Sequence, residues 1–253
     1  MTQVRHDRST TKYITKRFNG KYDIQLPTFQ RYPRDIYEPE RCFSMEQHLK
    51  KGDTLFDIGV SDGWVSAIYA GFVGGENMVL FEPSHAAWAN IKADWDANQL
   101  AQPRDTFWGF VGDTTQLVAP NPMPGEYAGY KDGWPMAAYA ETLIEEMCFR
   151  SLLSTGTNIP QTNLDDYVTR TGIVPTGLSI DVEGAELLVL RGAKQVLLAH
   201  HPMIWLSLHD INGALTYDYH TTKEEVFQFL TDCGYTMTWL ENYGDSHWFC
   251  NAV

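Results

Sequence analysis

The chain has 253 residues, of which 43% are hydrophobic and 20% charged, so a disordered or fibrous protein is excluded and a folded globular one is expected. Its net charge of -13 opposes the phosphate backbone, and we expect no duplex nucleic acid as a partner. The mean hydropathy is -0.31, and charged residues interrupt the apolar run at residues 184–199, so no membrane partner is expected either.

The N-terminal residues and the cysteines predict a cytoplasmic location. Residues 1–21 are basic and lack the apolar run of a secretory signal, so they are expected to form a solvated arm within an N-terminal extension, residues 1–45. Four cysteines without a Cys-x-x-Cys pair are few for a disulfide scaffold and fit a reducing compartment. Residues 46–253 are expected to form one domain, and the sequence leaves the oligomeric state open.

From about residue 50 onward, apolar runs and turn residues alternate as strands and helices do. Strands are predicted at residues 54–59, 77–82 and 107–111, separated by helices at residues 64–73 and after Ser84, which is expected to cap the second helix. Further strands are predicted at residues 178–182 and 203–208, joined by a helical run that reaches Leu198. Thr222 and Glu225 then form a capping box for a helix that ends at Gly234.

The last two strands, at residues 235–240 and 247–250, are predicted to form a hairpin. A seven-stranded α/β sheet that ends in an antiparallel hairpin is the Rossmann-like layout of class I methyltransferases, whereas a typical NAD-binding sheet stays parallel. Residues 114–177 interrupt the alternation and are rich in proline, glycine and aromatic side chains, with a helix predicted near residues 137–153. We expect this inserted segment to cover the substrate.

A glycine-containing loop between the first strand and its helix predicts a nucleotide-like cofactor. Asp57, Gly59, Ser61 and Gly63 lie in this loop, where glycines permit close backbone approach to a ligand. The loop is neither a phosphate-binding P-loop nor the three-glycine dinucleotide motif, and an ordinary turn would also explain its glycines. Glu82 supports the cofactor site, because it ends the second strand, where it can bind ribose hydroxyls. Asp113 closes the third strand and is a candidate for binding the adenine, although a turn-forming aspartate explains its position equally well.

The most specific run is residues 180–193, in which Asp181, Glu183 and Glu186 follow a strand end and enter a helix. This run resembles the signature of the FkbM family of S-adenosylmethionine-dependent methyltransferases, Ile-Asp-x-Glu-Gly-x-Glu followed by Leu and Arg-Gly-Ala. The resemblance extends from about Tyr37 to Trp248. Matching segments follow in the family's order at residues 37–40, 52–53, 57–63, 81–83 and 164–166.

The resemblance implies S-adenosyl-L-methionine as cofactor and methylation of a hydroxyl on a sugar or glycosylated small molecule. The expected partner is therefore a small-molecule or glycan acceptor. The chain departs from the family pattern at Val60 and Ser61, which replace the usual Ala-Asn, and at two further serines. Ser179 replaces a frequent lysine, and Ser207 replaces a frequent glutamate.

Methyl transfer from a sulfonium requires mainly alignment and a base for the acceptor hydroxyl. Asp57 is expected to hold the methionyl ammonium, and Asp181 is expected beside the cofactor at a second strand end. The candidates for the base are His209, Asp181 and Glu183, and His209 is favoured because its ordinary pKa lies near neutral pH. A purely packing role for His209 explains its position equally well.

Three alternatives remain open at this point. The same three candidates, together with Asp210, form a possible divalent-cation site, although no metal is the favoured expectation. A glycine loop followed by a strand-end acid also serves NAD in oxidoreductases, but the third glycine of their motif is absent. A non-catalytic cofactor-binding module would share the fold, but the retained Asp57, Gly59, Gly63 and Glu82 argue against it.

Overall fold

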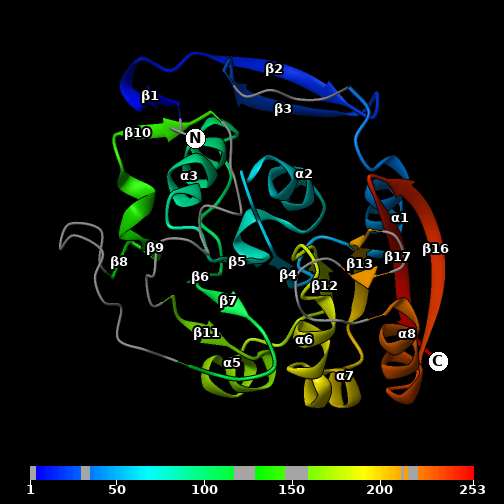
Figure 1. Cartoon of the computed structure of the whole chain (residues 1–253). Coiled ribbons are helices and arrows are strands. Elements are labelled where there is room, and N and C mark those ends of the chain that lie inside the picture. The colour runs from blue at the N-terminus through cyan, green and yellow to red at the C-terminus, as the bar shows by residue number, and fades with distance from the viewer. Residues whose placement is uncertain (1–3, 30–34, 117–128, 146–158, 212–213, 216–221) are drawn as a thin grey trace.

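A seven-stranded sheet forms the centre of the protein (Figure 1). The computed structural model describes residues 4–29, 35–116, 129–145, 159–211, 214–215 and 222–253. Across the sheet the strands follow in the order β16 (Tyr235–Tyr243), β17 (Asp245–Ala252), β13 (Met203–Leu208), β12 (Gly177–Ile180), β4 (Leu55–Ile58), β5 (Met78–Glu82) and β6 (Asp105–Trp108). The predicted seven-stranded α/β sheet with its C-terminal hairpin is therefore confirmed.

The direction of the strands matches the apolar patterning of the sequence. Strands β13, β12, β4, β5 and β6 run parallel, and every residue of β4 and β5 is buried, as expected for strands covered on both faces. Strand β17 is antiparallel to both β13 and β16, and among its residues only His247 and Cys250 are buried. The hairpin is thus a more exposed part of the sheet than β4 and β5.

Helices cover both faces of the sheet. Side chains such as Leu55 and Leu80 point to one face, which is covered by α1 (Pro39–His48), α2 (Trp64–Val73) and α3 (Ala87–Ala97). Their neighbours Phe56 and Phe81 point to the other face, which is covered by α5 (Leu164–Thr171), α6 (Glu186–Arg191), α7 (Lys194–His200) and α8 (Lys223–Asp232). Within the described ranges, no helix is long and apolar enough to cross a membrane.

The chain order of the strands reverses between β4 and β12. From β4 the chain proceeds through β5 to β6 in one direction, and from β12 through β13 in the other. The loops that leave the carboxyl ends of β4 and β12 therefore turn to opposite faces and open a crevice between them, which is where α/β sheets bind ligands. Gly59, Asp181 and Glu183 lie directly after these two strand ends.

Several predicted boundaries differ from the structure. Helix α3 begins at Ala87 with Ala86 at its N-cap, so Ser84 is not the cap. The third strand ends at Trp108, and β7 (Phe110–Val111) pairs instead with β11 (Gln161–Thr162) outside the main sheet. The predicted run to Leu198 is two helices, α6 and α7, separated at Gly192, whereas the predicted capping box of α8 is confirmed.

The N-terminal residues are not a solvated arm over residues 4–29. Strands β2 (Tyr13–Phe18) and β3 (Tyr22–Pro27) form a hairpin that lies over α2 and α3 (Figure 1), and it buries Phe18, Ile24 and Leu26 in the core. Strand β1 (Arg5–Asp7) pairs with β10 (Thr142–Ile144), and the 3₁₀ turn η1 (Arg8–Thr10) connects it to the hairpin. The buried apolar residues explain why this basic segment packs.

The segment at residues 114–177 contains two kinds of structure within its described part. The first is irregular and pairs with the N-terminus, and it includes β8 (Tyr130–Lys131), β9 (Trp134–Pro135), the 3₁₀ turn η4 (Met136–Tyr139) and β10. Of the helix predicted near residues 137–153, only the 3₁₀ turn η4 is present up to residue 145, because β10 follows it, and the remainder lies outside the described residues. The second is α5, whose Tyr167 packs on Phe56 and Phe81, so this helix belongs to the layer on the sheet.

Candidate active site

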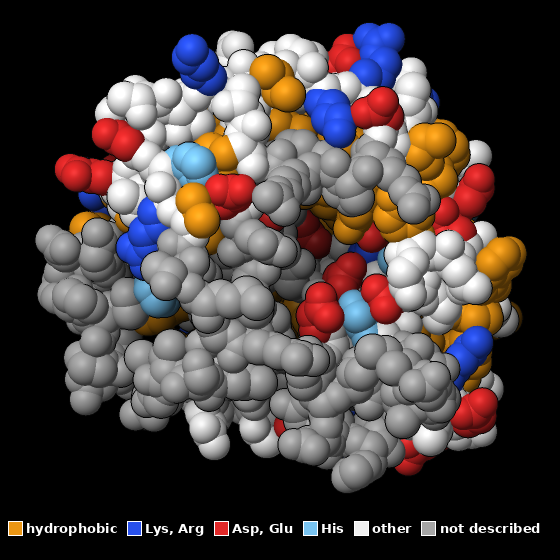
Figure 2. Space-filling view, turned by 45° about the horizontal axis from the view of Figure 1, so that its top comes forward, with side chains coloured by type: hydrophobic (Ala, Val, Ile, Leu, Met, Phe, Trp, Pro, Cys, Tyr) orange, Lys and Arg blue, Asp and Glu red, His pale blue; other side chains and the backbone are white. Residues whose placement is uncertain are grey.

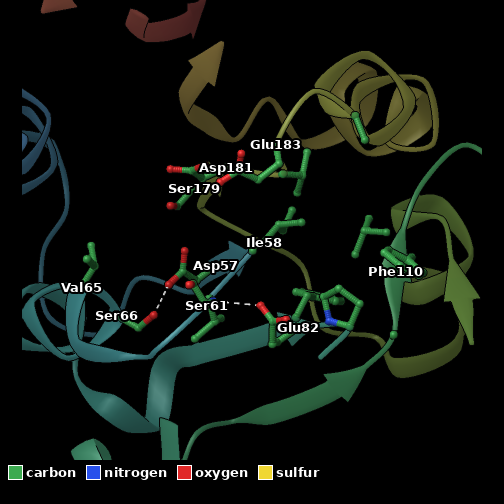
Figure 3. A pocket seen from close by; sticks show the side chains of 18 of the residues that line it. Asp57, Ile58, Ser61, Val65, Ser66, Glu82, Phe110, Ser179, Asp181 and Glu183 are labelled. Atoms are coloured by element: carbon green, nitrogen blue, oxygen red, sulfur yellow. Dashed lines mark hydrogen bonds between the residues drawn. The ribbon is translucent and has the colours of Figure 1, made fainter. Parts of the chain in front are cut away.

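A cavity of about 440 Å³ lies at the carboxyl ends of β4, β5 and β12, and Figure 3 shows its walls. This volume is typical of a small-molecule site. One wall comes from β4 and β5 and carries Asp57 and Glu82, and the facing wall comes from β12 and carries Asp181 and Glu183. Phe110 closes one end, and helix α1 and the residues before it close the other.

Asp57 is the third residue of β4 and is almost fully buried. Its carboxylate accepts a hydrogen bond from the hydroxyl of Ser66 on α2. Burial raises the pKa of Asp57, while the Ser66 and Ser179 hydroxyls and the positive charge of Arg41 oppose that shift. A buried carboxylate that lines the cavity gives an ammonium group a strong electrostatic partner, as expected from the sequence.

Glu82 ends β5, and two backbone amides hold its carboxylate in the cavity wall. The amide of Ser61 donates to Oε2 at 2.8 Å, and that of Ser84 donates to Oε1 at 2.7 Å. Burial raises the pKa of Glu82 to about 7, although these two amides lower it. A carboxylate has about four lone-pair sites. Glu82 therefore keeps acceptor capacity for two ribose hydroxyls.

The two glycines of the loop have different functions. Gly59 has a φ of 93°, and a Cβ there would lie 1.8 Å from the carbonyl oxygen of Asp181, so β4 and β12 approach too closely for any side chain. Gly63 begins α2, and a Cβ there would meet Ile91 on α3, so this glycine serves helix packing. Asp113 is exposed and is not among the residues that line the cavity.

Arg41 also lines the cavity, although the sequence did not single it out. It lies on α1 with 2% of its side chain exposed, and it extends under the strand ends. Its guanidinium donates to the hydroxyls of Ser207 at 2.6 Å and Ser179 at 2.9 Å. These are the two serines that depart from the family pattern. In this chain the buried positive charge therefore comes from α1, and the two serines are the only sequence signal that could have indicated it.

The same guanidinium neutralises two carboxylates. It lies 3.1 Å from Glu38 Oε2 and 3.3 Å from Asp181 Oδ2. Burial raises the pKa of Asp181, but the positive charges of Arg41 and His209 outweigh it and hold that pKa below its usual value. Ser207 also donates to Asp181 Oδ2 at 3.1 Å. Asp181 is thus fixed as an anion at the edge of the cavity.

His209 follows β13 and lies among four carboxylates. Its Nδ1 is 2.8 Å from Glu186, and its Nε2 faces Asp181, Glu183 and Asp245. Burial lowers the pKa of His209, but the hydrogen bond with Glu186 and the nearby negative charges raise it to about 9 overall. The ring is therefore protonated at neutral pH in this arrangement. An imidazolium has no lone pair to accept a proton, so the geometry does not favour the expected role of His209 as base.

The structure brings most of the predicted site residues together. Asp57, Gly59, Ser61, Glu82, Asp181 and Glu183 line one cavity, and His209 borders it through Asp181 and Glu183. Gly63 and Asp113 do not line it, and Asp245 was missed because it lies far away in the chain. Glu186 accepts a hydrogen bond from the amide of Gly184 and also contacts His209.

S-adenosyl-L-methionine, which the resemblance implies, fits these residues. The carboxylates of Asp57 and Glu82 line the same cavity from neighbouring strands, so one ligand can place an ammonium on the first and ribose hydroxyls on the second. Gly59 and Ser61, which lie between them in the chain, also line the cavity. Figure 3 shows both carboxylates on the wall that faces Asp181 and Glu183.

Comparisons with known proteins agree with this assignment. Residues 57–237 match the family model described as the methyltransferase FkbM domain. The structure is similar to the FkbM methyltransferase from Methylobacillus flagellatus KT, with a TM-score of 0.50 and 17% identity over 80% of this chain and 44% of that one. The chain thus spans less than half the length of that protein, and the likeness shows a shared fold.

Two other solved structures have lower TM-scores. A precorrin-6y C5,15-methyltransferase from Geobacter metallireducens has a TM-score of 0.47 and 12% identity, over 85% of this chain and 88% of that one. Fibrillarin from Aeropyrum pernix, in complex with natively bound S-adenosyl-L-methionine, has a TM-score of 0.47 and 11% identity, over 96% of this chain and the whole of that one.

Proposed function

Because the chain belongs to the FkbM methyltransferase domain family and its cofactor is S-adenosyl-L-methionine, we propose that it methylates a hydroxyl of a sugar or a glycosylated small molecule. The observation that carries the proposal is the position of Asp181 and Glu183, which face Asp57 and Glu82 across one cavity. A hydroxyl donates hydrogen bonds to carboxylates, whereas a phosphate-rich acceptor would be repelled by them. The acid-rich wall therefore supports a neutral, hydroxyl-bearing acceptor.

The chemistry is an in-line displacement. The cofactor, when bound, supplies a methyl group on a sulfonium, whose carbon–sulfur bond breaks as the carbon–oxygen bond forms. The products are a methyl ether, adenosylhomocysteine and one proton. Asp57 and Glu82 hold and orient the donor, and the β12 wall orients the acceptor, so alignment is the main contribution of the protein.

Glu183 is the best-placed group to receive the proton from the hydroxyl. Half of its side chain is exposed at the mouth of the cavity, where an acceptor can reach it. Asp181 is instead held by Arg41 and Ser207, and His209 already carries a proton at neutral pH. We therefore place the proton on Glu183 and give His209 a positioning role in place of general-base catalysis.

Binding and turnover test this function separately. Isothermal titration should show binding of adenosylhomocysteine, while NAD should give no heat and no thermal stabilisation. Release of adenosylhomocysteine should then rise when a panel of sugars and glycosylated small molecules is added with S-adenosylmethionine. Stabilisation by NAD alone would favour an oxidoreductase, and no stabilisation by either ligand would favour a non-catalytic module. Turnover restricted to duplex RNA or DNA would contradict the acceptor class.

The location and partners are proposed on the same grounds. We propose a cytoplasmic protein that acts on a small-molecule or glycan acceptor, with no duplex nucleic acid or membrane as partner. Within the described residues, Cys42, Cys233 and Cys250 are free and buried, which suits a reducing compartment. Fractionation of cells that express the tagged protein tests the location, and recovery in a membrane or secreted fraction would contradict it.

A further inference from the structure

Five side chains from four elements converge beside the cofactor cavity. Asp181 and Glu183 follow β12, Glu186 begins α6, His209 follows β13 and Asp245 begins β17. The Nε2 atom of His209 lies 3.4 Å from Asp181 Oδ1, 3.6 Å from Glu183 Oε2 and 3.3 Å from Asp245 Oδ2. Figure 2 shows acidic side chains and a histidine gathered at a hollow near the centre of the view. One imidazole nitrogen therefore faces three carboxylates.

The other nitrogen of the ring is fixed by a fully buried carboxylate. Glu186 is 0% exposed, and its Oε1 lies 2.8 Å from Nδ1 of His209. An ionised carboxylate only accepts hydrogen bonds, so Nδ1 donates and Nε2 is directed at Asp181, Glu183 and Asp245. Histidines that bind metals are oriented by a carboxylate in this way.

Glu186 also indicates that the cluster carries more negative than positive charge. Its second oxygen, Oε2, is buried and has no hydrogen-bond partner among the described residues. Arg41 lies against Asp181 and Glu38, and no other described lysine or arginine forms an ion pair with the five groups. A buried carboxylate oxygen without a partner is costly, and a nearby cation would lower that cost.

We propose that Asp181, Glu183 and His209 bind a divalent cation, with Asp245 beside them, and that the ion displaces the Nε2 proton of His209, which leaves to water. One ligand atom from each of the first three lies within 4.8 Å of the others. Carboxylate oxygens with a single imidazole suit Mg²⁺ or Mn²⁺, whereas structural zinc sites use mainly cysteine and histidine. This proposal replaces the expectation of no metal. Asp245 takes the place given to Asp210, whose side chain lies outside the described residues.

The site deepens the proposed function, on which its catalytic role rests. Asp181 and Glu183 line both the cation site and the cofactor cavity, so an acceptor oxygen bound to the ion lies next to the donor wall. A divalent ion lowers the pKa of a bound hydroxyl and fixes its direction, which is the help that a sugar hydroxyl needs. The second oxygen of Glu183 stays free to receive the proton.

Manganese binding tests the site without cofactor or acceptor. Protein treated with chelator and then dialysed should bind about one Mn²⁺, seen as loss of the free-ion signal in electron paramagnetic resonance. Glu183→Gln and Asp245→Asn should each weaken this binding at least tenfold. Glu224→Gln on the exposed face of α8 makes the same charge change away from the cluster and should leave the affinity unchanged.

The outcomes separate this proposal from the function on which it rests. Equal Mn²⁺ affinity in Glu183→Gln and Glu224→Gln, or no binding by the unaltered protein, would overturn the cation site. Adenosylhomocysteine binding in excess chelator is measured alongside and tests the cofactor site by itself. Failure of that binding with intact Mn²⁺ binding would count against the proposed function alone.

Discussion

The two walls of the cavity are built in different ways. We call the wall from β4 and β5 the cofactor wall, and the facing wall from β12 the acceptor wall, after their proposed ligands. Asp57, Gly59 and Glu82 lie between residues 57 and 82, on two consecutive strands. The acceptor wall combines Arg41 with residues that follow β12 and β13, and Arg41 and Asp181 are 140 residues apart. The first wall is therefore a local property of the sequence. The second exists only when distant elements pack, so changes there should act on folding and turnover before they act on cofactor affinity.

The largest effect is expected from Arg41→Met. This change leaves Glu38 and Asp181 without the guanidinium that neutralises them under the sheet, and loss of one partner from a buried ion pair costs about 3–5 kcal/mol. Urea unfolding followed by circular dichroism measures the loss. Arg17→Met is the matched control because Arg17 pairs with Asp23 at the surface, where an ion pair contributes about 1 kcal/mol or less. Equal losses in the two variants would show that the buried network is not stabilising.

The second-largest effect is expected at Gly59, where β4 and β12 approach most closely and the two walls meet. Gly59→Ala places a Cβ against the carbonyl of Asp181 and forces alanine to a φ of 93°. The two penalties together should cost about 3 kcal/mol and weaken adenosylhomocysteine binding. Gly172→Ala, at a positive φ with no atom within 4 Å of the added Cβ, should cost only about 1 kcal/mol and keep the affinity. Similar losses of stability and affinity in both variants would contradict the close approach of β4 and β12.

The contrast between the walls also explains what sequence reasoning achieved. Asp57, Gly59, Ser61, Glu82 and the acids after β12 line one cavity, as the sequence predicts, because each motif is contiguous and lies at a strand end. Arg41 and Asp245 were missed because their function depends on contacts across the fold, and nothing adjacent in the chain marks them. Asp113 was placed in the site by analogy with the strand ends before it, but the third strand already ends at Trp108.

The same reasoning failed at the N-terminus for a different reason. Its charge suggested a solvated arm, but its strands β2 and β3 bury Phe18, Ile24 and Leu26. Burial of large apolar side chains outweighs solvation of their charged neighbours, which stay exposed on the other face of a hairpin. The apolar residues of this segment, and not its net charge, therefore decide that it packs.

His209→Ala should affect the acceptor wall alone. We expect it to change turnover and to leave cofactor affinity unchanged, with a smaller effect than the two preceding substitutions. Turnover is expected to fall about 100-fold because the ring positions the acceptor end, while adenosylhomocysteine affinity stays within threefold. Glu82→Ala should instead weaken the binding of adenosylhomocysteine at least tenfold. It removes the carboxylate, held by the amides of Ser61 and Ser84, to which the ribose hydroxyls are expected to donate. Titration calorimetry and initial rates measure the two quantities. A large loss of adenosylhomocysteine affinity in His209→Ala would show that the acceptor wall also binds the cofactor, and would contradict the separation of the two walls.

The smallest effect concerns the charge of Glu82. Burial raises the pKa of Glu82 to about 7 in the free protein, and ribose hydroxyls donate to its ionised form, so binding below that pH must also remove a proton. Adenosylhomocysteine affinity should fall about tenfold from pH 8 to pH 6, because the ionised fraction of such a group falls by that factor. Glu82→Gln should bind adenosylhomocysteine more weakly, and its affinity should not change between pH 8 and pH 6. Burial also raises the pKa of Glu38 to about 7. If the affinity of Glu82→Gln still falls between pH 8 and pH 6, the titrating group is therefore Glu38, beside Arg41, and not Glu82.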